Sequence, residues 1–163
     1  VLRAIREADL ILMGPGSLYT SVIPNLLVGG VTEEICRSDA LKLYICNIMT
    51  QDGETEHMTA SDHLRALMEH SAPGIVDLCL ANSAPLSREL LERYREEDAA
   101  PICVDQEEIR KLGVELVERP LITKDCLLAR HASDLLARAV MELYGARAMR
   151  IFNQEDEYII EET

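Results

Sequence analysis

The stretch Gly14–Ser21 constrains the fold of this chain more than any other. It reads Gly-Pro-Gly-Ser-Leu-Tyr-Thr-Ser, follows an apolar run at 8–13 and precedes a second apolar run at 22–28. This order predicts a strand, a glycine turn and a helix, with Thr20 and Ser21 as N-caps of the helix. Glycine permits positive φ and close approach of a ligand to the backbone. The turn therefore predicts a phosphate cradle of backbone N–H groups, with an ordinary strand-to-helix turn as the alternative.

Strand-like and helix-like segments alternate along the whole chain. Apolar runs predict further strands at 41–46, 75–81, 102–104, 114–117 and 149–152. Helical spacing of apolar residues predicts helices that open near residues 59, 86, 106 and 133, the last ending at Gly145. Continuous apolar runs are typical of a parallel sheet covered on both faces. The pattern predicts an α/β fold in one domain spanning residues 1–163, which ends in an acidic tail at about 153–163.

Polar residues or glycine directly follow four of these strands. They are Gly14, Asn47, Asn82 and Asp105. The carboxyl ends of parallel strands share one edge of a sheet, and open α/β sheets bind their ligands at that edge. Each of these residues alone is also suited to capping a turn. Their common edge predicts a ligand cleft.

Composition and charge exclude several classes of function. A net charge of −13 argues against a nucleic-acid partner, which needs a basic surface. No segment is long and apolar enough to span a membrane, and the start lacks the pattern of a signal peptide, so we expect a cytoplasmic protein without membrane insertion. The five cysteines show no C-x-x-C spacing, which favours buried reduced thiols over a disulfide framework or a metal site.

Three groups of side chains are candidates for chemistry. Ser17 lies in no Gly-x-Ser-x-Gly motif, because Tyr19 replaces the second glycine, and this argues against a hydrolase. The histidines near Asp62 lie at 57, 63 and 70, a spacing that favours surface or packing roles over a metal site. The pair at 130–131, Arg-His, precedes a predicted helix and is a candidate for contact with an anionic ligand, with a solvated surface pair as the alternative.

The start of the chain reads as the end of a helix. Residues 1–8 have apolar positions at helical spacing, but neither an initiator Met nor a capping residue precedes them. We therefore expect the chain to be part of a longer protein. A half-domain of this kind would expose a sheet edge, which favours association between copies.

Two long motifs resemble one family. The segments 8–28 and 44–55, followed by Ser-Asp-His at 61–63, are similar to the gluconeogenesis factor family within the 2-phospho-L-lactate transferase-like (CofD-like) superfamily. The resemblance extends from the first residues to about Ala139 and corresponds to the C-terminal half of such a protein. It implies a Rossmann-like three-layer fold with a mainly parallel sheet.

The resemblance also implies a function. In the gluconeogenesis factor branch, the ligand is a UDP-sugar, notably UDP-N-acetylglucosamine. The protein there regulates cell envelope precursor supply and cell shape during gluconeogenic growth, and regulatory protein partners are expected. In the transferase branch, a phospho-lactyl group moves from a guanosine diphosphate carrier to the deazaflavin Fo, with magnesium. Leu18-Tyr19 and the segment 47–55 look like the regulator branch. None of the residues implied for ligand contact is an evident general base, which favours binding over catalysis, without a resident cofactor or metal.

Ligand-binding residues follow from the same resemblance, position by position. Those implied for phosphate, cleft wall, nucleotide or sugar are Gly14, Gly16, Ser17, Leu18, Tyr19, Thr20, Ser21, Asn25, Asn47, Tyr94 and Arg130. Tyr94 would stack on or hydrogen-bond the nucleotide or sugar, and Arg130 would pair with the diphosphate or sugar. The family continues Arg-His with Asp-Pro, whereas this chain has Ala132-Ser133.

Overall fold

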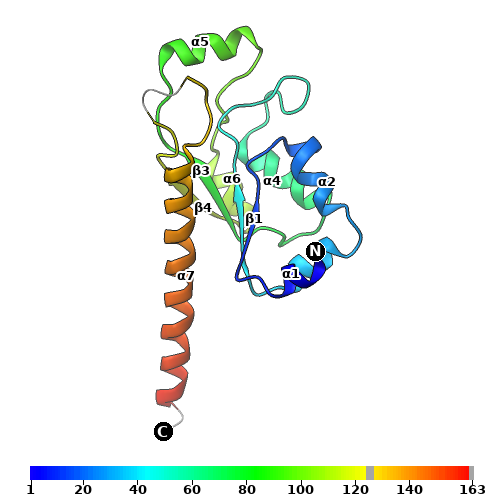
Figure 1. Cartoon of the computed structure of the whole chain (residues 1–163), viewed down its shortest axis with the longest axis vertical. Helices are drawn as coiled ribbons and strands as arrows, with labels where there is room; N and C mark the ends of the chain where they lie inside the picture. The colour runs from blue at the N-terminus through cyan, green and yellow to red at the C-terminus, as the bar shows by residue number, and fades with distance from the viewer. Residues whose placement is uncertain (124–126, 162–163) are drawn as a thin grey trace.

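The computed structural model describes residues 1–123 and 127–161, which form a three-layer α/β fold (Figure 1). Its sheet has the order β1-β2-β3-β4, and each neighbouring pair of strands is parallel. The strands are β1 (Leu10–Met13), β2 (Leu41–Ile45), β3 (Leu78–Asn82) and β4 (Glu115–Arg119). The predicted α/β class and parallel sheet are confirmed.

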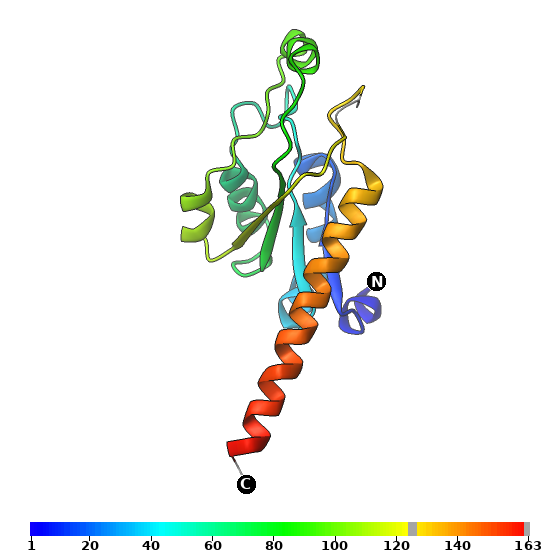
Figure 2. The same ribbon diagram turned by 90° about the vertical axis from the view of Figure 1, so that its left-hand side faces the viewer.

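Helices cover the two faces of the sheet unequally. In chain order they are α1 (Leu2–Arg6), the π-helical turn η1 (Leu18–Val22), α2 (Ile23–Leu26), α3 (Val31–Arg37), α4 (Ala60–Glu69), α5 (Arg88–Glu96), α6 (Gln106–Lys111) and α7 (Ser133–Glu161). Figure 2 shows α7 on one side of the sheet and α4 and α6 on the other. We call these sides the α7 face and the α4 face. Helix α5 lies beyond the carboxyl edge of the strands (Figure 1).

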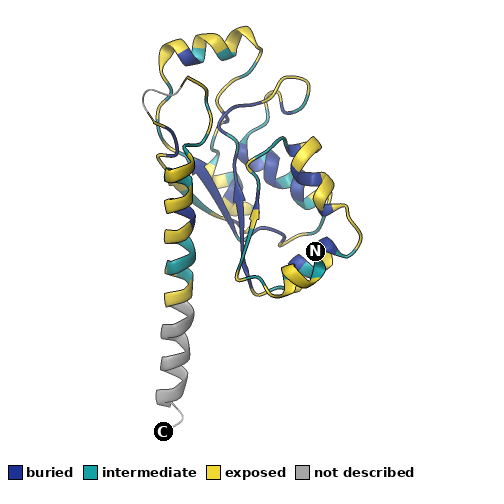
Figure 3. Ribbon diagram, viewed as in Figure 1, coloured by how far each residue is buried: buried dark blue, intermediate teal, exposed yellow. Residues whose placement is uncertain are grey.

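Alternation along β2 divides the core between the two faces. Leu43 and Ile45 pack with Val140 of α7, whereas Tyr44 packs with Leu64 and its neighbours on the α4 face. All five residues of β2 are buried, as expected for a central parallel strand, while β4 is largely exposed (Figure 3). The sheet therefore has a buried centre and more exposed edges.

Helix α4 begins as the sequence predicts. The side chain of Thr59 accepts a hydrogen bond from the backbone N–H of Asp62, and the Asp62 carboxylate accepts one from the N–H of Thr59. This reciprocal capping box satisfies two N–H groups that a helix start otherwise leaves unpaired. It fixes where α4 begins, beside the carboxyl edge of the sheet.

Two predicted strands are wrong. Residues 102–104 do not join the sheet, because the N–H of Ile102 donates to the carbonyl of Ile48 and this segment pairs with a loop instead. Residues 149–152 lie inside α7, which continues through Gly145 to Glu161. Good helix formers and the absence of proline after Gly145 outweigh the local strand preference there. The predicted acidic tail lies mostly within α7, and its last two residues fall outside the described part.

The cysteine prediction is correct for two thiols and wrong for two. Cys46 and Cys79 are buried, whereas Cys36 and Cys103 are exposed, and all four are free. Cys126 lies outside the described residues. Over 1–123 and 127–161, no three His, Cys, Asp or Glu side chains are grouped as a metal site, and no helix is long and apolar enough to cross a membrane.

Candidate functional site

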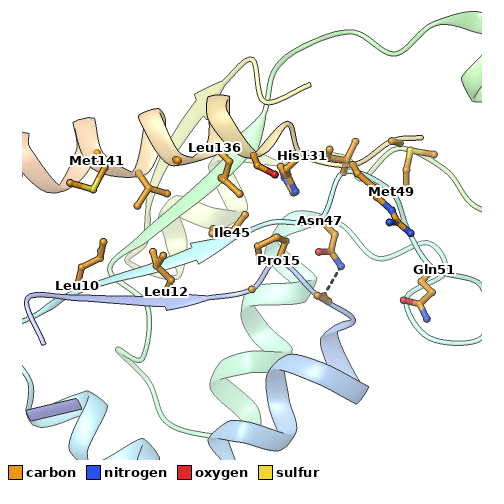
Figure 4. A pocket seen from close by; sticks show the side chains of 18 of the residues that line it. Leu10, Leu12, Pro15, Ile45, Asn47, Met49, Gln51, His131, Leu136 and Met141 are labelled. Carbon is orange, nitrogen blue, oxygen red and sulfur yellow. Dashed lines mark hydrogen bonds between the residues drawn. The ribbon is translucent and has the colours of Figure 1, made fainter. Parts of the chain in front are cut away.

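A cavity of about 900 Å³ lies between α7 and the carboxyl ends of β1 and β2. Its apolar wall comes from the sheet on one side and from α7 on the other (Figure 4). These apolar residues are Leu10, Leu12, Ile45, Leu136, Ala137, Val140 and Met141. Its polar end contains Gly14, Gly16, Asn47, Gln51, Tyr94, Arg130, His131 and Ser133. The cavity thus combines an apolar body with polar groups at the edge where the sequence predicts a cleft.

Gly14 ends β1 in a conformation that favours glycine. Its φ is +83°, and a Cβ atom added there would lie 3.0 Å from the carbonyl oxygen of Ile45. Glycine therefore lets the turn pass close to β2. Asn47, just after β2, donates from Nδ2 to the carbonyl oxygen of Gly16 at 2.9 Å. The turn and the end of β2 together form one corner of the cavity.

The predicted N-caps Thr20 and Ser21 are wrong, because the helical segment begins earlier. Ser17 occupies the N-cap position, and the N–H groups of Ser21 and Val22 both donate to its carbonyl oxygen. This wide turn places Pro24 in the first turn of α2, where its missing N–H has no intrahelical partner to lose. Thr20 and Ser21 consequently lie inside η1.

The N–H groups expected to hold phosphate have a partner within the chain. One carboxylate oxygen of Glu54 accepts from the backbone N–H of Tyr19 at 2.7 Å and from that of Thr20 at 3.1 Å. The hydroxyl of Ser17 donates to Gln51 Oε1 at 2.8 Å. Within Gly14–Ser21, only the turn residues 14–16 line the large cavity. Loop 47–55 therefore packs onto this stretch where the sequence predicts a ligand.

Other predicted site residues lie away from the large cavity. Ser21 and Asn25 line a smaller pocket of about 360 Å³ beside α2 and α3, and Asn25 Nδ2 donates to the carbonyl of Ser21 at 2.6 Å. Leu18 is fully buried in the core. Tyr19 makes an edge-to-face contact with the ring of His70, with ring centroids 5.8 Å apart. Their assignment as ligand contacts stays a prediction.

Tyr94 and Arg130 lie together at the polar end of the cavity. The hydroxyl oxygen of Tyr94 accepts from the N–H of Ala129 at 3.2 Å, and Arg93 donates from Nη1 to the carbonyl of Leu127 at 2.6 Å. Helix α5 therefore holds the segment that carries Arg130. Among the described residues that line the cavity, Arg130 alone carries a formal charge.

His131 also lines the cavity and is half-buried. Burial lowers its pKa, and a hydrogen bond to the backbone of Cys46 opposes that shift. Its Nε2 is sealed from solvent and has no hydrogen-bond partner within the described chain. The ring is therefore neutral at physiological pH and is fixed beside the end of β2.

Two polar residues at the carboxyl edge serve the loops. The side-chain oxygen of Asn82 accepts from the N–H groups of Ala84 and Leu121. The carboxylate of Asp105 accepts from the backbone N–H of Ser61 at 2.9 Å and from its hydroxyl at 2.6 Å. These bonds match the turn-capping alternative, and neither residue lines the large cavity.

The α4 face buries one titratable pair. His63 is fully buried, and its Nδ1 lies 2.9 Å from the hydroxyl of Tyr44. Burial lowers the pKa of His63 to about 4, although the charges of Asp62 and Glu54 act in the opposite direction. The packing role predicted for His63 is confirmed. The pair lies outside the large cavity.

Sequence reasoning missed part of the cavity wall. Gln51 has no signal of its own within the family-like segment 47–55, and the sequence indicates Ser133 only as a helix cap. The α7 residues Leu136, Val140 and Met141 are at helical spacing, which indicates one face of a helix. That spacing does not reveal whether the face is packed or left open, so this wall had no usable signal in the sequence.

Known proteins resemble most of this chain. The family model for 2-phospho-L-lactate transferase CofD matches residues 1–122. A gluconeogenesis factor from Halalkalibacterium halodurans is 47% identical over 141 residues, covering 86% of this chain and 44% of the relative. One from Bacillus subtilis is 45% identical over 139 residues, covering 85% and 44%. The chain thus spans less than half the length of these relatives.

A solved structure has the same fold. The crystal structure of a UPF0052 family member from Bacillus halodurans superposes with a TM-score of 0.82 at 47% identity. The match covers 86% of this chain and 45% of that one.

Proposed function

The chain belongs to the CofD family and its relatives include gluconeogenesis factors, and from this premise we propose that its large cavity binds a UDP-sugar of the UDP-N-acetylglucosamine type. In this proposal the chain is the C-terminal part of a cytoplasmic regulator that links gluconeogenic growth to cell envelope synthesis and cell shape. Regulatory protein partners would recognise the form of the protein that has the UDP-sugar bound.

The charge of the cavity is the observation that carries the proposal. The chain has a net charge of −13, yet none of the described residues lining the cavity is a carboxylate, and Arg130 supplies a positive charge there. An anion is therefore better tolerated in this cavity than over the rest of the surface. Arginine offers paired donors that suit a diphosphate.

The remaining lining suits the uncharged parts of such a ligand. Tyr94 offers an aromatic face and a hydroxyl proton, while Asn47 and Gln51 offer amide groups. The apolar wall between β1 and α7 offers contact area for a base or a sugar ring. A cavity of about 900 Å³ lies within the size range of small-molecule sites.

The name of the matching family model favours a second candidate, a transferase of the 2-phospho-L-lactate type. Magnesium in that reaction would need oxygen ligands, usually carboxylates. The described cavity lining contains neutral amides and two hydroxyls but no carboxylate, so it does not fit the metal. His131 keeps its free ring nitrogen sealed from solvent, and no general base is exposed among these lining residues. Binding without turnover is therefore the better-supported function.

Isothermal titration calorimetry tests the proposal. We would titrate UDP-N-acetylglucosamine into this chain, its Arg130→Ala variant and the Halalkalibacterium halodurans relative. We expect Arg130→Ala to weaken binding about 10- to 100-fold, since hydrogen bonds to charged groups contribute about 1.5–3 kcal/mol. Arg138→Ala is the matched control, because Arg138 is exposed on α7 and does not line the cavity.

Each outcome has a clear meaning. Binding that Arg130→Ala weakens and Arg138→Ala does not would support the proposal. Binding by the relative alone would overturn it for this chain and assign the contacts to the part of the relative that this chain does not match. Turnover of a guanosine diphosphate carrier with Fo, without UDP-sugar binding, would establish the transferase instead.

A further inference from the structure

We propose that Asn47 determines ligand specificity in this cavity through its unpartnered amide oxygen, which accepts an amide-type N–H group of the ligand. The inference rests on the proposed function and makes it more specific. It identifies the part of the ligand that lies at the end of β2.

The orientation of the Asn47 amide is set by the glycine turn. Its Nδ2 donates to the carbonyl oxygen of Gly16 at 2.9 Å. A carbonyl can only accept, so the nitrogen and not the oxygen of the amide must face Gly16. Figure 4 shows this bond as a dashed line, with the oxygen of Asn47 turned away from it. The amide cannot flip without placing two oxygens against each other.

The oxygen of Asn47 is available to a ligand. Over residues 1–123 and 127–161 no hydrogen bond of the protein reaches its Oδ1, and this atom is not among the polar atoms sealed from solvent. Asn47 lines the large cavity and also a second cavity of about 330 Å³ under α5. Its acceptor is therefore accessible on a residue that lines both cavities.

The neighbouring ring adds no competing donor. His131 uses its hydrogen bond to the backbone of Cys46, the residue directly before Asn47. Nε2 is sealed from solvent and has no hydrogen-bond partner in the described part of the chain, so it does not reach a ligand in the cavity.

The chemistry selects among the groups of a nucleotide sugar. The uracil ring carries an N3–H, and the acetamido group of the sugar carries an amide N–H, and either can donate to Asn47. Cytosine has an unprotonated acceptor at the same ring position, so it would face Asn47 with like polarity. The diphosphate would then lie toward Arg130 at the other side of the polar end. The ligand thus acquires a direction within the cavity.

The first experiment changes the ligand and leaves the protein intact. Calorimetry on the unmodified chain would compare UDP-N-acetylglucosamine with UDP-2-deoxyglucose, which has neither the acetamido N–H nor a hydroxyl donor at that position, and with the N3-methyluracil analogue, which lacks the imide N–H. We expect one of the two analogues to bind about 10-fold more weakly or worse, because it leaves the acceptor unpaired. The analogue that fails identifies which N–H faces Asn47.

The second experiment tests whether Asn47 makes the contact that discriminates between the ligands. In Asn47→Ala the discrimination between the matched ligand and the failing analogue should fall to within about 2-fold. Thr32→Ala is the control, because it removes a similar side-chain bond to a backbone carbonyl, that of Leu26, away from the cavity. We expect it to keep the full discrimination.

The outcomes separate this inference from the function on which it rests. UDP-N-acetylglucosamine binding with equal affinity for both analogues would overturn the role of Asn47 and leave the proposed function standing. Discrimination that persists in Asn47→Ala would also overturn it. If the unmodified chain binds none of the three ligands, both the inference and the proposed function fail.

Discussion

The two faces of the sheet differ in how completely they are covered. On the α4 face, Leu64 and Leu67 are fully buried among side chains of several helices. On the α7 face, Leu12 of β1 is 46% exposed and Met141 of α7 is 61% exposed. A helix is about 10 Å wide and strands lie about 4.8 Å apart, so one helix covers about two strands. Helix α7 packs mainly on β2 and β3, and the part of the sheet left over, at β1, becomes the cavity.

The difference separates stability from binding. A closed face contributes free energy of folding through close packing, and its side chains have little freedom to meet a ligand. An open face leaves apolar and polar groups available. We therefore expect substitutions on the α4 face to change the free energy of unfolding, and substitutions on the α7 face to change affinity.

The largest expected effect is on the packed face. Leu64→Ala should lower the free energy of unfolding by about 2–5 kcal/mol, because it removes buried methyl groups and leaves a void. Met141→Ala on the open face should change it by less than about 1 kcal/mol. Urea unfolding followed by circular dichroism measures both. Similar losses for the two variants would show that the α7 face is as tightly packed as the other and would break the comparison.

Acidification should also act through the packed face. The pKa of His63 is about 4 in the folded chain and about 6.5 when the residue is exposed, so the unfolded chain binds the extra proton between these values. Stability should fall as the pH drops from about 6.5 to about 4, by an amount on the order of 3 kcal/mol, and His63 should contribute no further loss below that. Urea midpoints at pH 7.5 and 4.5 measure the change.

His63→Gln isolates this contribution. Glutamine does not titrate, so the variant should be less stable at pH 7.5 but should lose less on acidification than the unmodified chain. His131 also has a pKa lowered by burial and acts in the same direction. The difference between the two proteins removes its share. An equal loss of stability in both proteins would mean that His63 is already protonated in the folded chain at pH 4.5.

Local patterns in the sequence predicted the frame of the molecule. The apolar runs at β1, β2 and β3 and the capping box at Thr59 are short-range features, and each depends on residues close together in the chain. The glycine turn after β1 and Asn47 after β2 follow from the same strands. Parallel order then brings their carboxyl ends to one edge, so this corner of the cavity could be predicted.

The remainder depends on contacts between distant segments. Glu54 bonds to N–H groups about 35 residues earlier, and Asn82 bonds to Leu121, 39 residues later, so no local pattern indicates either partner. The short run at 102–104 has strand-like residues but pairs with a loop. In α7, the apolar spacing is visible, yet only the tertiary structure shows that part of its face lines an open cavity.

The smallest expected effect is at Glu54, which joins the two regions. Loop 47–55 places Gln51 at the cavity and Glu54 on the N–H groups of Tyr19 and Thr20. Glu54→Gln keeps an oxygen that accepts from both N–H groups but removes its charge. We expect the free energy of unfolding to fall by about 0.5–1.5 kcal/mol, as for a charge-assisted bond replaced by a neutral one near a helix start. The control is Glu56→Gln. Glu56 follows this loop directly, and its exposed carboxylate accepts from the backbone N–H of Gly53, so we expect a smaller change in the free energy of unfolding.

The same variant tests whether the two faces are independent. Ser17 still holds Gln51 when the charge of Glu54 is removed, so the loop should keep its place at the cavity. UDP-N-acetylglucosamine affinity should then change less than about 3-fold, as expected for sites that share no partners. A loss of 10-fold or more, measured by calorimetry, would show that packing on the α4 face sets the geometry of the cavity. In that case stability and binding are coupled through loop 47–55, and the separation between the faces does not hold.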